Sequence, residues 1–152
     1  MRVLIVEDNP TDRLLIEDIV LARGHQVDSF ADAESAWSLA QEEPFPLILL
    51  DLWLPGMDGL ELCRRLRSLP ESDQSVILVI TGVDRREILE EVLEAGANDY
   101  LTKPVAGPLL HVRLAVAERL ARDIARRKRT ERALAQNALR DAVTQLANRT
   151  LF

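Results

Sequence analysis

The stretch "VLIVEDNPTD", Val3–Asp12, is the clearest structural signal in the chain. Four apolar residues run directly into two adjacent carboxylates, Glu7 and Asp8. A short continuous run of Val, Ile and Leu is typical of a strand that is covered on both faces of a sheet. Two like charges at the end of a buried strand repel each other, so we expect a positive group to lie beside them.

Similar apolar runs recur along the chain with helical patterns between them. We predict buried strands at Arg2–Val6, Leu47–Leu50 and Val76–Ile80, and weaker strands at Gln26–Phe30 and Asn98–Leu101. Apolar residues at helical spacing are Leu14, Leu15, Ile19 and Val20 before Gly24, and Ile88, Val92 and Ala95 before Gly96. Asp58 and Asp84 stand where helix N-caps are expected. This alternation predicts an α/β fold, a doubly wound five-stranded parallel sheet with helices on both faces.

The composition is that of a soluble globular protein. Its 152 residues are 47% hydrophobic and 29% charged, which suits one domain with an appendage. No apolar run approaches the roughly 18 residues that a membrane helix needs, and no signal-peptide pattern is present. A single cysteine, Cys63, permits no internal disulfide, as is typical of a reducing compartment. We therefore expect a cytoplasmic protein without a membrane partner.

The net charge of −6 hides a difference between two parts of the chain. Residues 1–107 contain 9 Lys and Arg against 21 Asp and Glu, whereas residues 108–152 contain 10 against 4. Phosphate contacts supply most of the affinity for nucleic acid, so the acidic part is a poor candidate for binding it. The basic part is rich in Ala, Leu, Arg and Glu and lacks Gly and Pro after Pro108, which predicts one long helix.

This helix also carries an incomplete heptad pattern. A seam can be drawn through Leu110, Ala117, Leu120, Ile124, Leu134 and Ala138. Charged residues fall on the same seam at Arg113, Arg127 and Glu131. A coiled coil and a solvated continuation of the last domain helix therefore both stay open.

Polar side chains follow four of the five predicted strands, at the edge where ligands bind in sheets of this kind. They are Glu7 and Asp8 after the first strand, Asp51 after the third, Thr81 after the fourth and Lys103 after the fifth. Three converging carboxylates call for a hard divalent cation, and Mg²⁺ shares itself between carboxylate and phosphate oxygens. A lysine and a hydroxyl complete a site for a phosphoryl group. Asp51 is the candidate nucleophile, because a carboxylate can form an aspartyl-phosphate.

The chain from Arg2 to about Leu120 resembles the receiver domain of a bacterial two-component response regulator. The matching motifs, in order, are "VEDNP", "LLDLWLPGMDGLEL", "VITG" and "GANDYLTKP". The resemblance implies the flavodoxin-like (βα)5 fold with an extended C-terminal helix. It implies a receiver domain over residues 1–120 with its fifth helix starting near 107, a helical linker over 121–140, and the truncated start of an output domain over 141–152.

The resemblance also assigns the site. Asp51 would accept a phosphoryl group from a histidine kinase or phosphotransfer protein with Mg²⁺. The metal would be held by Glu7, Asp8, Asp51 and the backbone carbonyl of Trp53. The chain itself would then be a regulatory phosphoacceptor rather than an enzyme, capable only of its own phosphorylation and dephosphorylation.

Three further residues receive roles from the same resemblance. Thr81 and Lys103 would contact the phosphoryl group, and Tyr100 would be the aromatic switch that becomes buried when Thr81 moves. The Lys103–Pro104 peptide bond would be cis. Phosphorylation would shift the population of two conformations, because the added charge draws Thr81 and Lys103 toward it.

The surface that changes in this family is formed by the fourth helix, the fifth strand and the fifth helix. In this chain it includes Arg85, Arg86, Glu90, Glu91, Asp99 and Arg113. Such mixed charges can pair across a two-fold axis, which favours a homodimer through this face and the C-terminal helix. A solvated charged surface is the alternative.

The last residues, "LRDAVTQLANRTLF", resemble the opening of a diguanylate cyclase (GGDEF) domain, where a "D-x-L-T-G-L-x-N-R" stretch follows a signalling helix. The matching residues are Asp141, Thr144, Leu146, Asn148, Arg149 and Phe152. Gln145 replaces the usual Gly and Val143 the usual Leu. The resemblance implies a diguanylate cyclase as a candidate activity of a full-length protein, and an ordinary helix-to-loop segment is the alternative.

The same residues disfavour two other functions. Phosphatases of the haloacid dehalogenase type need a second Asp two residues after the nucleophile, where this chain has Trp53. A DNA-binding output would need a helix-turn-helix, and the 45 residues after Gly107 fall mostly into one helix. The alternatives that stay open are a receiver that controls a DNA-binding or other output, and a receiver that binds proteins without control by phosphorylation.

Overall fold

A computed structural model describes the backbone of residues 1–151 and the side chains of residues 1–143. The strands are β1 (Arg2–Val6), β2 (Gln26–Phe30), β3 (Leu47–Asp51), β4 (Val76–Thr81) and β5 (Asp99–Thr102). The helices are α1 (Pro10–Ala22), α2 (Ala33–Glu42), α3 (Gly59–Ser68), α4 (Arg86–Glu94) and α5 (Gly107–Leu151), with a short 3-10 turn η1 (Ser72–Gln74). All five predicted strands are therefore confirmed.

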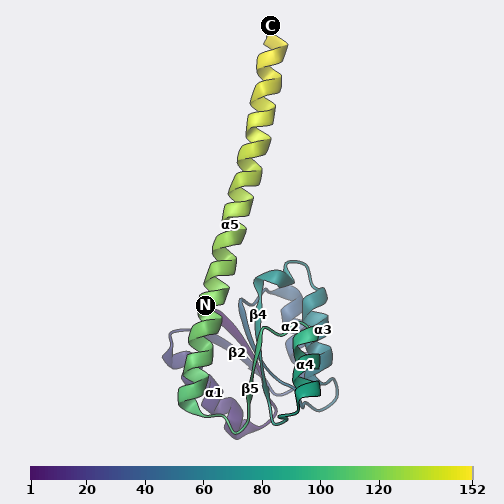
Figure 1. The fold of residues 1–152 in the computed structure, drawn as a ribbon, viewed down its shortest axis with the longest axis vertical. Helices are drawn as coiled ribbons and strands as arrows, with labels where there is room; N and C mark the ends of the chain where they lie inside the picture. Colours follow the sequence, from purple (N-terminus) through teal and green to yellow (C-terminus); the bar gives the residue numbers. More distant parts are fainter. Residues whose placement is uncertain (152) are drawn as a thin grey trace. The chain divides into compact units, whose positions relative to one another are not determined.

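The strands form one parallel sheet in the order β2-β1-β3-β4-β5. Helices α2, α3 and α4 cover one face, and α1 with the first turns of α5 covers the other (Figure 1). The inner strands β3 and β4 are buried along their whole length, which explains their continuous runs of apolar residues. The doubly wound, flavodoxin-like fold predicted from the sequence is confirmed.

Helix starts agree with the sequence at one of the two expected caps. The Asp58 side chain accepts a hydrogen bond from the Glu61 N–H at the start of α3, as expected. The expectation for Asp84 is wrong, because α4 begins at Arg86 and its N-cap position is held by Arg85 without a side-chain hydrogen bond. The backbone at Arg85 is extended (φ −108°, ψ 128°), so the helix begins one residue later than a cap at Asp84 would allow.

Within the body of the protein, Met1–Ala121, the first turns of α5 are held by apolar packing and by a buried charge. Leu110 and Ala117 of the predicted heptad seam are buried in this body. Glu118 is only 4% exposed, and the Arg23 Nε donates to both of its carboxylate oxygens at 2.7 and 3.1 Å. Burial is the largest influence and raises the pKa of Glu118, but the hydrogen bonds and positive charges of Arg23 and His25 together outweigh burial and lower the pKa below its ordinary value.

A second unit begins at Arg122. The described side chains of α5 beyond Arg122 are mostly exposed, including Leu134 and Leu139. No helix among the described residues is long and apolar enough to span a membrane. Most residues of the expected output-domain start, 144–152, have side chains outside the described part of the chain, so that expectation and the residue ranges of the linker stay predictions.

The end of the sheet where β3 and β4 begin, called here the amino edge, is closed by one arginine of α3. The Arg67 guanidinium donates to the carbonyls of Gly96, Ser72 and Ser75 and to the Asn98 Oδ1. These acceptors come from the turns before β4 and β5. Arg67 therefore connects α3 by hydrogen bonds to the turns that precede β4 and β5.

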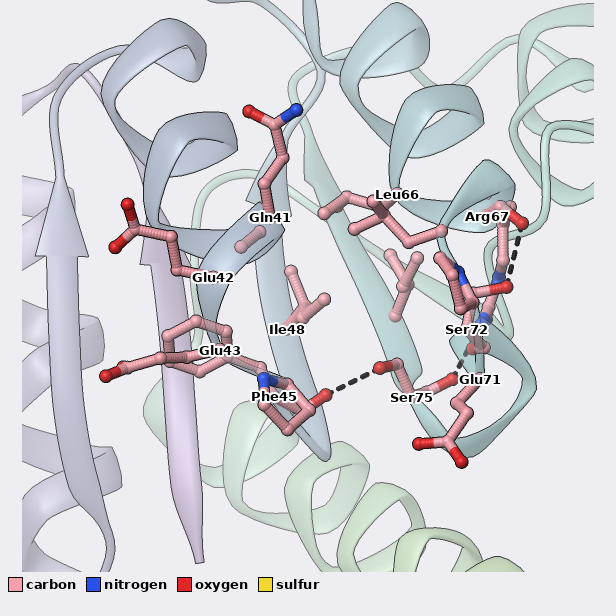
Figure 2. A pocket seen from close by; sticks show the side chains of 15 residues that line it. Gln41, Glu42, Glu43, Phe45, Ile48, Leu66, Arg67, Glu71, Ser72 and Ser75 are labelled. Carbon is pink, nitrogen blue, oxygen red and sulfur yellow. Dashed lines mark hydrogen bonds between the residues drawn. The ribbon is translucent and has the colours of Figure 1, made fainter.

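A hollow of about 240 Å³ lies beside Arg67, between the ends of α2 and α3. Figure 2 shows Ile48 and Leu66 inside it, with Glu42 and Glu71 toward its rim. The Ser75 hydroxyl donates to the Phe45 carbonyl across its lower side, at 2.6 Å. Four of the five N–H donors of Arg67 are taken by protein acceptors, so this guanidinium offers at most one donor to an anionic ligand in the hollow.

Candidate functional site at the carboxyl edge

The opposite end of the sheet, called here the carboxyl edge, gathers the polar residues singled out by the sequence. Glu7 and Asp8 follow β1, while Asp51 and Thr81 are the last residues of β3 and β4. Glu7, Asp51 and Thr81 are at most 4% exposed, whereas Asp8 is exposed. Pairing of Val6 with Leu50 in the β1–β3 ladder brings the ends of these strands side by side.

Three carboxylates meet at this edge. One oxygen from each of Glu7, Asp8 and Asp51 lies within 4.8 Å of the other two. The second oxygen of Glu7, Oε2, is buried and has no hydrogen-bond partner among the described residues. A buried carboxylate oxygen without a partner beside two further carboxylates is a donor set that fits a hard divalent cation such as Mg²⁺.

Lys103, which the sequence predicted as a contact of the phosphoryl group, also lies beside these carboxylates. Its Nζ lies 2.5 Å from Glu7 Oε1, 3.3 Å from Asp51 Oδ2 and 3.2 Å from Asp12 Oδ2. The residue reaches this position directly after β5, where its backbone N–H donates to the Thr81 carbonyl at 2.7 Å. The Lys103–Pro104 peptide bond is cis, as expected from the resemblance.

Burial and crowding shift the ionisation of this cluster. Burial, followed by the neighbouring Asp51 carboxyl group, raises the pKa of Glu7 to about 8, although Lys103 acts in the opposite direction. Burial lowers the pKa of Lys103, but its hydrogen bond to Glu7 and the charge of Asp51 outweigh burial and raise that pKa. Lys103 therefore stays protonated, while Glu7 holds a proton more readily than an ordinary carboxyl group.

The loop after β3 is held closely around Asp51. The Trp53 N–H donates to Asp51 Oδ1 at 3.2 Å, and the Trp53 side chain is 59% exposed. At Gly59, a Cβ atom would lie 2.1 Å from the Asp51 carbonyl oxygen, so the start of α3 can approach the strand only with glycine. From α2, Glu34 Oε1 accepts a hydrogen bond from the Met57 N–H at 2.8 Å.

Thr81 and Tyr100 occupy neighbouring strands on the side of α4. The Thr81 Oγ1 accepts a hydrogen bond from the Val83 N–H at 3.1 Å. Tyr100 is half-buried and packs against the core. Two residues of the expected dimer face pair within the chain, since the Arg113 Nη1 donates to Asp99 Oδ2 at 3.2 Å.

Three contacts at this edge were not expected from the sequence. Asp12 contacts Lys103, the Arg13 Nη1 donates to the Glu7 carbonyl at 2.9 Å, and Glu34 holds the loop after Asp51. Asp12 and Arg13 lie in the first turn of α1, where Asn9 caps the helix. The contacts of Asp12 and Arg13 could have been expected from their place in the sequence. The first turn of a helix that directly follows a strand stays close to the end of that strand, where the site lies.

Comparison with known proteins gives a consistent result. The family model described as the response regulator receiver domain matches residues 3–115. The transcriptional regulatory protein AfsQ1 of Streptomyces coelicolor is 39% identical over 113 residues, covering 73% of this chain and 48% of that protein. The response regulator PleD of Caulobacter vibrioides is 34% identical over 113 residues, covering 74% of this chain and 25% of that protein. The chain thus spans half or less of the length of these two relatives.

Solved structures agree with the fold. A CheY-like response regulator receiver domain protein from Methanospirillum hungatei superposes with a TM-score of 0.72 at 28% identity, covering 82% of this chain and 96% of that one. The receiver domain of the sensor histidine kinase PA1611 from Pseudomonas aeruginosa superposes with a TM-score of 0.70 at 31% identity, covering 79% and 96%. That structure is described with a magnesium ion coordinated in its active-site cleft.

Proposed function

The chain belongs to the response regulator receiver family, and on this basis we propose that Asp51 accepts a phosphoryl group from a histidine kinase or phosphotransfer protein. Receiver domains of two-component systems serve phosphorylation-based signalling. One observation carries the proposal. The Asp51 carboxylate ends a buried strand, lies within the three-carboxylate cluster and is 3.3 Å from the Lys103 ammonium.

We further propose that Glu7, Asp8 and Asp51 hold Mg²⁺, together with the backbone carbonyl of Trp53. Receiver domains bind Mg²⁺ at an acidic pocket, and the carboxylate cluster with the partnerless Glu7 Oε2 supports such a pocket here. When bound, the cation supplies positive charge against the carboxylates and the phosphoryl oxygens.

The side chains of this chain would perform the rest of the transfer. A carboxylate oxygen of Asp51 forms the new bond to phosphorus while the bond from phosphorus to the donor nitrogen breaks. Lys103 is protonated and close enough to Asp51 to place its positive charge beside the transferred oxygens. Thr81 would donate its hydroxyl hydrogen to one of them.

Transmission would start from Thr81. Its movement toward the phosphoryl group would let Tyr100 become buried and would change the face formed by α4, β5 and α5. We propose that this change controls a homodimer and is passed along α5 through a linker to an output domain. A diguanylate cyclase is the output that the tail residues favour, whereas the name of the relative AfsQ1 favours a transcriptional one. Production of cyclic di-GMP by the full-length protein would support the cyclase.

The central test is the intact mass of the protein after incubation with a small-molecule phosphodonor, with Mg²⁺ and with a chelator. We expect a gain of one phosphoryl group that requires Mg²⁺ and is lost in Asp51→Asn. Asp58→Asn is the matched control, because it removes a carboxylate from the same loop and Asn can still cap α3. A phosphoryl group retained by Asp51→Asn would contradict the assignment. No gain in the wild type would favour a receiver that acts by protein binding alone.

A further inference from the structure

Asp12 is a fourth carboxylate at the carboxyl edge, and none of the roles proposed above includes it. Its Oδ2 lies 3.2 Å from the Lys103 Nζ. It belongs to the first turn of α1, and the Asn9 Oδ1 accepts a hydrogen bond from its backbone N–H. The Asp12 backbone is therefore fixed, and its side chain is directed to the same ammonium that faces Glu7 and Asp51.

We propose that Asp12 is a competing counter-ion for Lys103, which a phosphoryl group on Asp51 must displace before Lys103 can bind it. The inference rests on the proposed function and adds a residue that sets how tightly the site holds the phosphoryl group. Asp12 acts through Lys103, so it is a positioning residue rather than a catalytic one.

The Lys103 ammonium can engage only as many acceptors as it has N–H donors. An ammonium group has three N–H donors, and three carboxylates lie close enough to engage all of them. Because phosphorylation converts Asp51 itself into an acyl phosphate, its phosphoryl oxygens compete for Lys103 with the two carboxylates that remain, Glu7 and Asp12. Removing a carboxylate from its partner costs most where water cannot replace that partner.

The burial of the three carboxylates decides which of them gives way. The side chains of Glu7 and Asp51 are 2% and 4% exposed, whereas that of Asp12 is 28% exposed. Asp12 can therefore exchange Lys103 for water at a smaller cost than Glu7, which stays buried. The resting contact between Asp12 and Lys103 is thus the one that phosphorylation breaks.

The test measures binding of beryllofluoride, a phosphoryl mimic, at saturating Mg²⁺, followed by tryptophan fluorescence in a Trp37→Phe background, so that Trp53 is the reporter. We expect Asp12→Asn to bind it on the order of two- to fivefold more tightly, because a partly exposed ion pair contributes up to about 1 kcal/mol. Asp18→Asn is the matched control, since Asp18 is an exposed acidic residue of the same helix. We expect its affinity to equal that of the wild type.

Measurements at high salt distinguish the direct contact between Asp12 and Lys103 from a general effect of removing one negative charge. Salt of about 0.5 M screens separated charges strongly and contact pairs much less, so the gain in Asp12→Asn should persist there. An unchanged affinity in Asp12→Asn, an equal gain in Asp18→Asn, or a gain that vanishes in salt would overturn the inference while leaving the proposed function intact. Failure of the wild-type protein to bind beryllofluoride and to accept a phosphoryl group would overturn both. Thermal melts of both variants establish that they are folded.

Discussion

At the amino edge of the sheet, the Arg67 guanidinium donates to four acceptors, whereas at the carboxyl edge Lys103 faces three carboxylates and Glu7 Oε2 has no partner. Both cations are partly buried and both lie beside the ends of β3 and β4. At the amino edge the positive charge meets uncharged carbonyls and an amide. At the carboxyl edge negative charge exceeds positive charge.

The comparison suggests that Arg67 stabilises the fold, whereas Lys103 and its carboxylates form a binding site. Buried polar groups in folded proteins are nearly always hydrogen-bonded, so Arg67, which uses four of its five N–H donors on protein acceptors, adds to the free energy of unfolding. An excess of buried carboxylates lowers that free energy until a cation arrives. Substitutions at the two edges should therefore have opposite effects on stability and on phosphorylation.

The largest expected effect is that of Asp51→Asn. We expect this variant to lose phosphorylation entirely, because the nucleophilic oxygen is gone. In the absence of Mg²⁺ it should unfold at an equal or higher urea concentration than the wild type, because repulsion within the three-carboxylate cluster is relieved. A clear loss of stability in the absence of Mg²⁺ would show that Asp51 supports the fold, and the contrast between the edges would fail.

Arg67→Met should give the reverse result. It leaves several acceptors at the amino edge without their donor, and we expect a loss of about 3 kcal/mol in the free energy of unfolding. Urea denaturation measures this loss. Arg64→Met, on the exposed side of the same helix, is the control and should change stability little. Phosphorylation per folded molecule should be retained in both variants, and its loss in Arg67→Met alone would link the two edges.

A smaller effect should appear in the pH dependence of stability. The pKa of Glu7 is about 8 in the folded protein, against an ordinary value of 4.5. Between these values the folded protein binds a proton that the unfolded chain releases, so without Mg²⁺ this group makes the free energy of unfolding fall as the pH rises from about 4.5 to 8. Glu7→Gln should flatten this part of the profile in urea denaturation. An identical slope in the variant would refute the role of Glu7.

The smallest expected effect concerns Glu34, which holds the loop after Asp51 from α2. Glu34→Ala removes the acceptor for the Met57 N–H, and we expect a severalfold higher phosphodonor concentration for half-maximal phosphorylation. Glu34→Gln retains an acceptor oxygen and should restore most of the wild-type behaviour. Equal effects of the two variants would indicate that the charge of Glu34 matters instead of its hydrogen bond.

The sequence predicted the sheet because apolar periodicity is a local signal. The ranges predicted for the first two strands agree with β1 and β2. The third and fourth strands extend one residue further than predicted, because Asp51 and Thr81 are polar and yet pair with Ile80 and Thr102 in the sheet. Parallel strands align their carboxyl ends, which is why the positions of Glu7 and Asp51 could be predicted together.

Contacts between distant side chains could not be predicted in the same way. The pairing of Asp12 with Lys103 and of Glu34 with Met57 depends on how α1 and α2 pack on the sheet. Helical spacing indicates which face of a helix is buried, but it does not specify which residue of another element an exposed carboxylate meets. The hydrogen bonds of Arg67 could not be predicted for the same reason, because three of its four acceptors are backbone carbonyls without a sequence signature.

The buried pairing of Glu118 with Arg23 fixes the rotational phase of α5 at the point where it ends its packing in the body. Glu118 is three residues before Ala121, and His25 Nε2 lies 3.2 Å from the Glu118 carboxylate on the same side. Turning the helix about its axis would separate a buried carboxylate from its cation, which is costly. Each residue of an α-helix advances the chain by about 100° and 1.5 Å. A residue inserted between Leu110 and Glu118 would therefore turn the Glu118 carboxylate away from Arg23 by about 100°.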